Sequence, residues 1–140
     1  MPTPAAVPTH ANLEIVQGIF ASFGTGDIPA VVAALSEDIE WVVSGPRGIP
    51  FAGARRGKPA VLAFFSVLGQ TVGIQQFEPQ EFIVQGDQVV VIGLERLRVK
   101  ATGRIAENRW VMVFTLQAGR VVRYREFDDT AALAAAFHGA

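Results

Sequence analysis

The stretch WVMVFTLQAGRVVRYREFDDTAAL, residues 110–133, carries the most regular pattern in the chain. Strand-forming residues dominate on both sides of the dipeptide Ala118-Gly119, which predicts two antiparallel strands joined by a tight turn. Asp128 and Asp129 are good helix caps, so the segment TAALAAAF that follows them predicts a final helix. We therefore expect the chain to end with two long strands and a capped helix.

Side-chain parity in the second of these strands raises a question about Glu126. Successive side chains in a strand point to opposite faces, so Tyr124 and Glu126 share one face while Arg123 and Arg125 share the other. Carboxylates are rarely buried without a partner. Glu126 is thus either a solvated surface group or a buried group with a partner elsewhere in the fold.

Helical patterns come before the strands. From His10 to Gly24 apolar residues recur at a spacing of three and four, which predicts one helix. Asp27 and Pro29 suit the start of a second, short helix, and a strand through Ile39 to Val43 follows. The segment 44–57 is rich in Gly and Pro and is expected to be a loop, and residues 58–68 predict a third helix.

From Gln75 onward nearly every segment has strand character. Strands are expected over 75–85, 88–101, 107–116 and 120–127, with a turn at Gly86-Asp87. Helices followed by a meander of strands are typical of an α+β fold, in which helices cover one face of a curved antiparallel sheet. Neither face of these strands is cleanly polar, so we expect the second face to be covered either by the rest of a cone-like sheet or by a partner subunit, and a homodimer is expected.

Composition limits the classes of function. A chain of 140 residues fits one domain, and we expect a short disordered leader over 1–9 followed by a single domain over 10–140. The net charge is -1 with scattered Lys and Arg, and no apolar run reaches the roughly 18 residues of a membrane span, so neither nucleic acid nor a membrane is an expected partner. There is no Cys, and His10 and His138 lie near the termini, so we expect neither a metal site nor a cofactor. The chain begins without a signal-peptide pattern and is expected in the cytoplasm.

Three stretches carry a family resemblance: residues 26–41 (GDIPAVVAALSEDIEW), residues 49–65 (IPFAGARRGKPAVLAFF) and residues 110–133. They resemble the landmarks of the nuclear-transport-factor-2-like superfamily, specifically its SnoaL-like and ketosteroid-isomerase-related branch, from about His10 to Phe137. The resemblance implies a cone-shaped α+β barrel, usually dimeric, with an apolar pocket between the helices and the concave sheet. One scaffold of this kind hosts many functions.

The catalytic positions of two relatives can be carried over by resemblance. The base and the two oxyanion donors of ketosteroid isomerase fall on Val43, Ile19 and Met112, which are apolar, so steroid isomerisation by that set is not expected. Limonene-epoxide hydrolase is a closer match. Its arginine falls on Arg96 and one of its two carboxylates on Glu126, while its tyrosine corresponds to Trp41. Its second carboxylate falls on Arg98, which cannot serve as a general acid or base in the same way.

These comparisons give a set of candidate residues with an alternative for each. Glu126 and Arg96 are the candidate catalytic pair, and the alternative is a structural ion pair inside the barrel. The candidate substrate-binding residues are Trp41, Arg98, Trp110, Met112, Phe114 and Tyr124. For the two tryptophans the alternative is plain core packing, and for the tyrosine it is a hydrogen bond to the backbone. Arg55 and Arg56 lie in the Gly-rich segment and either overhang the pocket mouth or are solvated.

Two classes of function follow. The first is a small-molecule-binding protein whose apolar pocket performs acid-base chemistry of the isomerase, hydrolase or cyclase type, using Glu126 with Arg96. The second is a non-catalytic module for ligand binding or dimeric assembly. In both cases the expected partner is a small apolar or anionic molecule. The two classes differ in whether Glu126 is reachable from a cavity or sealed in a salt bridge.

Overall fold

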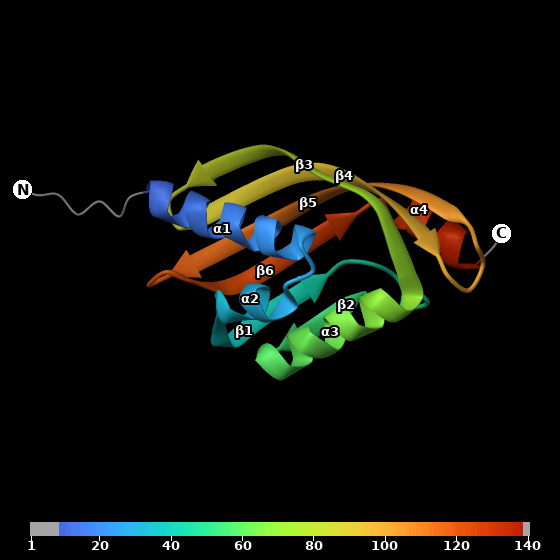
Figure 1. Ribbon diagram of the computed structural model, residues 1–140, viewed down its shortest axis with the longest axis horizontal. Coiled ribbons are helices and arrows are strands. Elements are labelled where there is room, and N and C mark those ends of the chain that lie inside the picture. Colours follow the sequence, from blue (N-terminus) through green and yellow to red (C-terminus); the bar gives the residue numbers. More distant parts are fainter. Residues whose placement is uncertain (1–8, 139–140) are drawn as a thin grey trace, which may run out of the picture.

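The computed structural model describes residues 9–138, which form four helices and six strands (Figure 1). The helices are α1 (Thr9–Gly24), α2 (Ile28–Ala33), α3 (Lys58–Thr71) and α4 (Thr130–His138). The strands are β1 (Leu35–Val43), β2 (Gly53–Arg56), β3 (Val72–Gln85), β4 (Gln88–Val99), β5 (Ile105–Gln117) and β6 (Arg120–Asp128). The leader expected over 1–9 lies outside the described residues, except for Thr9, which begins α1.

All six strands belong to one sheet in the order β2-β1-β6-β5-β4-β3. Neighbouring strands are antiparallel except β1 and β6, which run parallel. Figure 1 shows α1, α2 and α3 on one side of the sheet, where they contact β1, β3 and β4, while α4 packs against β5 and β4. The sheet stays open between its edge strands β2 and β3. Because helices cover one face of this single sheet, the expected cone-like α+β fold is confirmed.

Local sequence explains where the helices on this face begin. The Asp27 carboxylate accepts a hydrogen bond from the Ala30 backbone N–H, and Pro29 occupies the first turn, so α2 is capped as predicted. Gly57, with φ of +89°, precedes α3 and adopts a backbone conformation that residues with a Cβ rarely reach. These two turns direct α2 and α3 across the sheet.

One element was not expected from the sequence. Residues 53–56 form the short edge strand β2 within the Gly-rich segment, and they pair antiparallel with the end of β1. Four residues flanked by Gly and Pro give too short a pattern for a strand to be recognised. The strand brings Arg55 opposite Trp41, so both side chains face the same side of the sheet.

The register of β4, β5 and β6 determines which residues face the helices. Opposed residues on neighbouring strands point to the same face, and Trp110 lies opposite Gly93 on β4 and Asp128 on β6. Trp110 is 1% exposed whereas its neighbour Arg109 is exposed, so the Trp110 face is the inner one. A Cβ on Gly93 would lie 2.5 Å from the Trp110 ring, so a larger residue at 93 would displace it.

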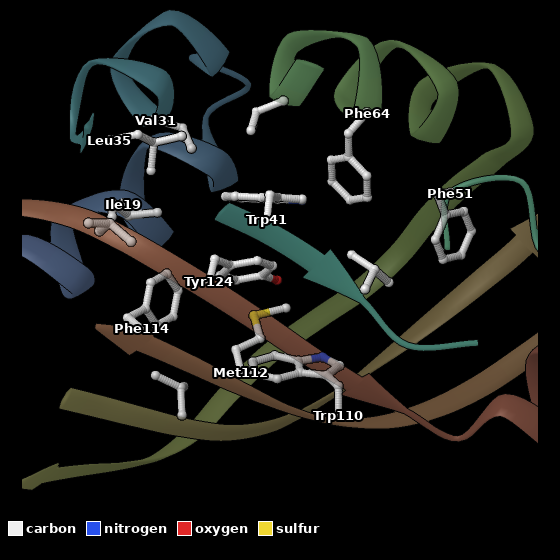
Figure 2. Packing of buried hydrophobic residues seen from close by; sticks show 14 of the residues in the cluster. Ile19, Val31, Leu35, Trp41, Phe51, Phe64, Trp110, Met112, Phe114 and Tyr124 are labelled. Carbon is white, nitrogen blue, oxygen red and sulfur yellow. The ribbon is translucent and has the colours of Figure 1, made fainter. Parts of the chain in front are cut away.

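Within the described chain, no helix combines the length and the apolar character that crossing a bilayer requires. The core instead fills the space between the inner face of the sheet and helices α1 to α3. Figure 2 shows its centre, where Trp41, Tyr124 and Met112 meet side chains from the helices. This core is incompletely filled, and the remaining space is the candidate site.

Candidate functional site

A cavity of about 60 Å³ lies between the inner face of the sheet and the helices. Its lining is largely apolar, and nine of the seventeen lining residues are aromatic. The lining residues are Ile19, Phe20, Phe23, Val31, Trp41, Phe51, Phe64, Phe65, Leu68, Ile74, Phe77, Glu95, Leu97, Met112, Phe114, Tyr124 and Glu126. The volume has room for a few water molecules, since each needs about 10–15 Å³ measured in this way.

The structure brings four of the six candidate binding residues to this cavity: Trp41, Met112, Phe114 and Tyr124. The Trp41 and Tyr124 rings are stacked, with ring centroids 3.8 Å apart (Figure 2). Trp110 is buried on the same face but does not line the cavity. Its ring instead stacks on Phe77 at 5.2 Å, so Trp110 supports the cavity wall.

Arg96 and Arg98 lie on the opposite face of the sheet, which corrects their expected place in the pocket. Arg96 is paired with Glu107 at 3.2 Å, and both side chains are exposed. Residues 95 and 108 are opposed in the β4–β5 register, so Glu95 shares the inner face and Arg96 must point outward. The expected pair between Glu126 and Arg96 is therefore not formed.

Glu126 faces the cavity and is 8% exposed. The Tyr124 hydroxyl donates a hydrogen bond to its Oε1, so the chain's only tyrosine has a side-chain partner and not a backbone one. Burial raises the pKa of Glu126 well above its usual value, and the nearby Asp128 raises it further, although the Tyr124 hydrogen bond acts in the other direction. A neutral carboxyl group in the cavity wall follows from these two causes.

Three further polar residues, which sequence reasoning missed as site residues, complete the cluster. Asn108 is 1% exposed, and its Nδ2 donates to Glu95 Oε2 at 2.7 Å and to Asp128 Oδ1 at 2.9 Å. Its Oδ1 accepts from the Asp129 backbone N–H at 2.7 Å. Asp129 caps α4 as predicted, whereas Asp128 turns inward toward this cluster. The signal in the sequence was parity, because residues 95 and 108 share the faces of Leu97 and Trp110.

Glu95, Glu126 and Asp128 form an acidic cluster without a counter-charge. Within residues 9–138 none of the three forms an ion pair with Arg or Lys. Burial raises the pKa of Glu95 to about 7, with a smaller contribution from the charge of Asp128, and burial also raises the pKa of Asp128. The acidic cluster must therefore hold protons or attract a cation at neutral pH.

Glu126 and Asp128 each shift the pKa of the other, so a proton can be shared between them. Two carboxyl groups can hydrogen-bond to each other only when one of them is protonated. Asp128 Oδ2 is buried and has no donor within the described chain, and a proton on Glu126 would supply one. The pair is thus arranged to store one proton beside the cavity.

One cation lies near the cavity without lining it. The Arg55 guanidinium sits 5.1 Å from the centroid of the Phe64 ring and donates to the Phe51 backbone oxygen at 2.9 Å. Phe51 and Phe64 themselves line the cavity, so they separate Arg55 from it. Arg56, its neighbour in sequence, is paired with Glu40 at 3.0 Å on the outer face.

Across residues 9–138, no three His, Cys, Asp or Glu side chains are arranged to hold a metal ion. A neutral carboxyl at Glu126 can donate a proton to an oxygen of a bound molecule. Glu95, whose pKa is near 7, can be ionised or neutral at physiological pH.

The acidic cluster predicts that stability falls as pH rises from about 4.5 to about 7. The pKa of Glu95 is raised from 4.5 to about 7, so over this interval the unfolded chain loses a proton that the folded chain keeps. The free energy of unfolding should then decrease by up to about 1.4 kcal/mol per pH unit for each such group. Urea unfolding at a series of pH values measures this slope, and Glu95→Gln should reduce it. A slope of zero or of opposite sign would contradict the protonated cluster.

The open, helix-covered sheet with an apolar cavity between the sheet and the helices defines a cone-shaped α+β protein. Residues 16–124 match the model of the SnoaL-like domain family, and the chain belongs to that family.

Three known proteins are similar to this chain. An NTF2-like protein from Burkholderia xenovorans LB400, known from a crystal structure, is 39% identical, with a TM-score of 0.85 over 94% of this chain and 99% of that one. TerC, co-crystallised with polyporic acid, is 27% identical, with a TM-score of 0.79 over 91% of this chain and 98% of that one. An uncharacterized protein of Mycobacterium tuberculosis is 27% identical over 117 residues, 84% of this chain and 88% of that protein.

Proposed function

We propose that the protein is an acid-base enzyme acting on a small, largely apolar organic molecule, with Glu126 as the group that transfers the proton. The reaction is of the isomerase, hydrolase or cyclase type. The observation that carries this proposal is a buried carboxyl group in the wall of an apolar cavity, with no cationic partner among residues 9–138. Such a group keeps its proton at neutral pH and can release it only to a bound molecule or to a neighbouring carboxylate.

The surroundings of Glu126 support proton transfer in both directions. When Glu126 gives its proton to an oxygen of the substrate, the Tyr124 hydroxyl still donates to Oε1 and stabilises the carboxylate that forms. The charge of Asp128 raises the pKa of Glu126, so the carboxylate that forms readily takes a proton back from the bound molecule or from water. Trp41 stacks on Tyr124 and restrains its ring, so the hydroxyl is held in position before the reaction begins.

The relatives support a pocket that binds small molecules. TerC, with 27% identity, was crystallised with polyporic acid, so a protein of this fold and similar sequence takes up a small organic molecule. In this chain the wall that would contact such a molecule consists of aromatic side chains from α1, α3 and the sheet. Aromatic side chains favour flat apolar compounds.

A second candidate is a non-catalytic module for ligand binding or assembly. The cavity of about 60 Å³ is far smaller than the roughly 300 Å³ or more of a typical ligand site, and Tyr124 already occupies one oxygen of Glu126. In this interpretation the acidic cluster is a structural feature. The salt bridge that this class predicted for Glu126 is not formed, however, which favours the enzyme.

A panel of small aromatic ketones and epoxides in deuterium oxide tests the proposal. Protonation of a ketone oxygen speeds loss of the neighbouring C–H proton, and deuterium enters at that carbon. Protonation of an epoxide oxygen allows water to break the C–O bond. We expect deuterium uptake or diol formation above the protein-free rate for at least one compound, read by mass spectrometry. Compounds that bind the cavity but none of which reacts would favour the non-catalytic module.

The outer face of the sheet predicts a homodimer. Phe127, 48% exposed, lies opposite the partly buried Val111, and Val42 on β1 is 37% exposed beside Arg125. This apolar surface faces away from the helices, and a second copy of the chain would cover it. Sedimentation at micromolar concentration should show a dimer, and Phe127→Glu should shift it toward monomer. A wild-type monomer under these conditions would contradict the prediction.

A further inference from the structure

We propose that the cavity selects an apolar molecule that carries a basic nitrogen, which Glu95 Oε1 binds as an ammonium group while the aromatic side chains enclose the apolar part. This inference rests on the proposed function, since it concerns the same cavity. It assigns the two lining carboxyls different tasks. Glu95 anchors the charged end of the molecule, and Glu126 remains the group that transfers a proton.

The charges of the lining residues favour a cation over an anion. Glu95 and Glu126 are the only ionisable lining residues apart from Tyr124, and no Lys, Arg or His is among them. Arg55 lies behind Phe51 and Phe64, and its guanidinium is occupied by the Phe51 carbonyl and the Phe64 ring. Although the buried indole N–H of Trp41 is an unpaired donor, an anion would enter a cavity with two carboxyls and no cation in its wall, whereas an ammonium group would find a carboxylate acceptor.

The geometry of Glu95 leaves one oxygen available for a ligand. Asn108 holds Oε2 at 2.7 Å, and Asn108 is itself fixed by Asp128 and by the Asp129 backbone. Within residues 9–138 no group donates to Oε1. Because Asn108 is buried and fully hydrogen-bonded, it sets the direction of the free oxygen before a ligand arrives.

An aromatic ring lies beside Glu95, and further rings of the cavity wall pack against it. Phe77 lies opposite Glu95 in the β3–β4 register, and its ring packs on Phe23 at 5.1 Å. Phe23 in turn lies 6.0 Å from Phe65. Faces of aromatic rings attract cations, and a set of rings beside a carboxylate is the arrangement that recognises organic ammonium groups. The face of the cavity near Glu95 thus provides both the charge and the rings.

Three small probes of equal ring size test this inference: benzylamine, which is a cation, benzyl alcohol, which is neutral, and benzoate, which is an anion. Titrations at about pH 8 keep Glu95 ionised and benzylamine charged. The Trp41 indole N–H signal in a nitrogen-15 spectrum reports occupancy, because Trp41 lines the cavity. Its signal can be assigned with Trp41→Phe. The same titrations are made with Glu95→Gln.

We expect wild type to bind benzylamine about 10-fold or more tightly than benzyl alcohol, with benzoate weakest. Glu95→Gln should remove the preference for benzylamine while leaving benzyl alcohol unchanged. Glu107→Gln is the matched control, since Glu107 lies on the outer face of the neighbouring strand, and it should bind all three probes like wild type.

Two results would overturn the inference while leaving the proposed function in place: benzoate or benzyl alcohol binding as tightly as benzylamine, or a benzylamine preference that survives in Glu95→Gln. A different result concerns both proposals. If no probe shifts the Trp41 signal up to the solubility limit, the cavity does not admit a single ring, and both the inference and the proposed enzyme are contradicted.

Discussion

Glu126→Gln is expected to lower turnover of an identified substrate by about 100-fold or more, while folding and ligand binding persist. Glutamine keeps the size of the side chain and can still accept the hydrogen bond from Tyr124. It cannot release a proton. Because the raised pKa already keeps Glu126 neutral in the folded protein, the neutral amide should leave the free energy of unfolding within about 1 kcal/mol of wild type.

Turnover and thermal melting of the same preparations check this prediction. Glu107→Gln serves as the control, because it changes a glutamate that is exposed on the far side of the sheet. Glu126→Gln turning over substrate at the wild-type rate would contradict the catalytic role. A loss of roughly 3 to 5 kcal/mol in stability would instead indicate a buried ion pair, although no cation that could form one is seen beside Glu126 in the described chain.

The sequence predicts the fold well because its local signals agree with the tertiary structure. The Asp27 cap with Pro29 and the turn at residues 118–119 lie where the pattern placed them, and α1 and β6 end within about a residue of expectation. Such signals are short-range: caps, turns and side-chain spacing depend on neighbouring residues. The parallel pairing of β1 with β6 and the edge strand β2 depend on contacts distant in sequence, and no local pattern indicates them.

The site is harder to predict because parity fixes which residues share a face but not which face is inside. On β4 one face carries Glu95 and the other Arg96, and each is accompanied by apolar residues. The resemblance to a hydrolase favoured Arg96. The structure places Glu95 inside, because Gly93 is the residue that makes room for the Trp110 ring. The close contact between Gly93 and Trp110 thus indicates which face of β4 points inward, which the apolar pattern of the sequence left undetermined.

Asn108 was missed for a related reason. The segment ENRW stands at the start of an expected strand, where three polar residues in a row indicate exposure to solvent, yet residue 108 is almost fully buried. A buried amide must satisfy its donors and its acceptor, and here two carboxylates and a backbone N–H do so. The burial of Asn108 depends on partners from two other strands, β4 and β6, and from the cap of α4, none of which is near it in sequence.

Asn108→Asp is therefore expected to be strongly destabilising, lowering the free energy of unfolding by roughly 3 to 5 kcal/mol at about pH 8. Aspartate has the same shape and keeps an oxygen for the Asp129 backbone N–H. It replaces the two donor hydrogens of Nδ2 with an acceptor, placed between Glu95 and Asp128. The new aspartate oxygen then faces the carboxylate oxygens of Glu95 and Asp128, and a hydrogen bond between two carboxyl groups forms only when one of them is protonated.

The loss should therefore shrink on lowering the pH to about 5, where the carboxyl groups of the acidic cluster take up protons more readily. Asn108→Ala is the matched control, since it removes the same hydrogen bonds without adding a charge. Its loss should be smaller than that of Asn108→Asp at the higher pH. Equal losses for both variants at both pH values, measured by urea unfolding, would show that position 108 does not sense the charge of Glu95 and Asp128. The fixed orientation of Glu95, on which cation selection depends, would then have to come from another residue.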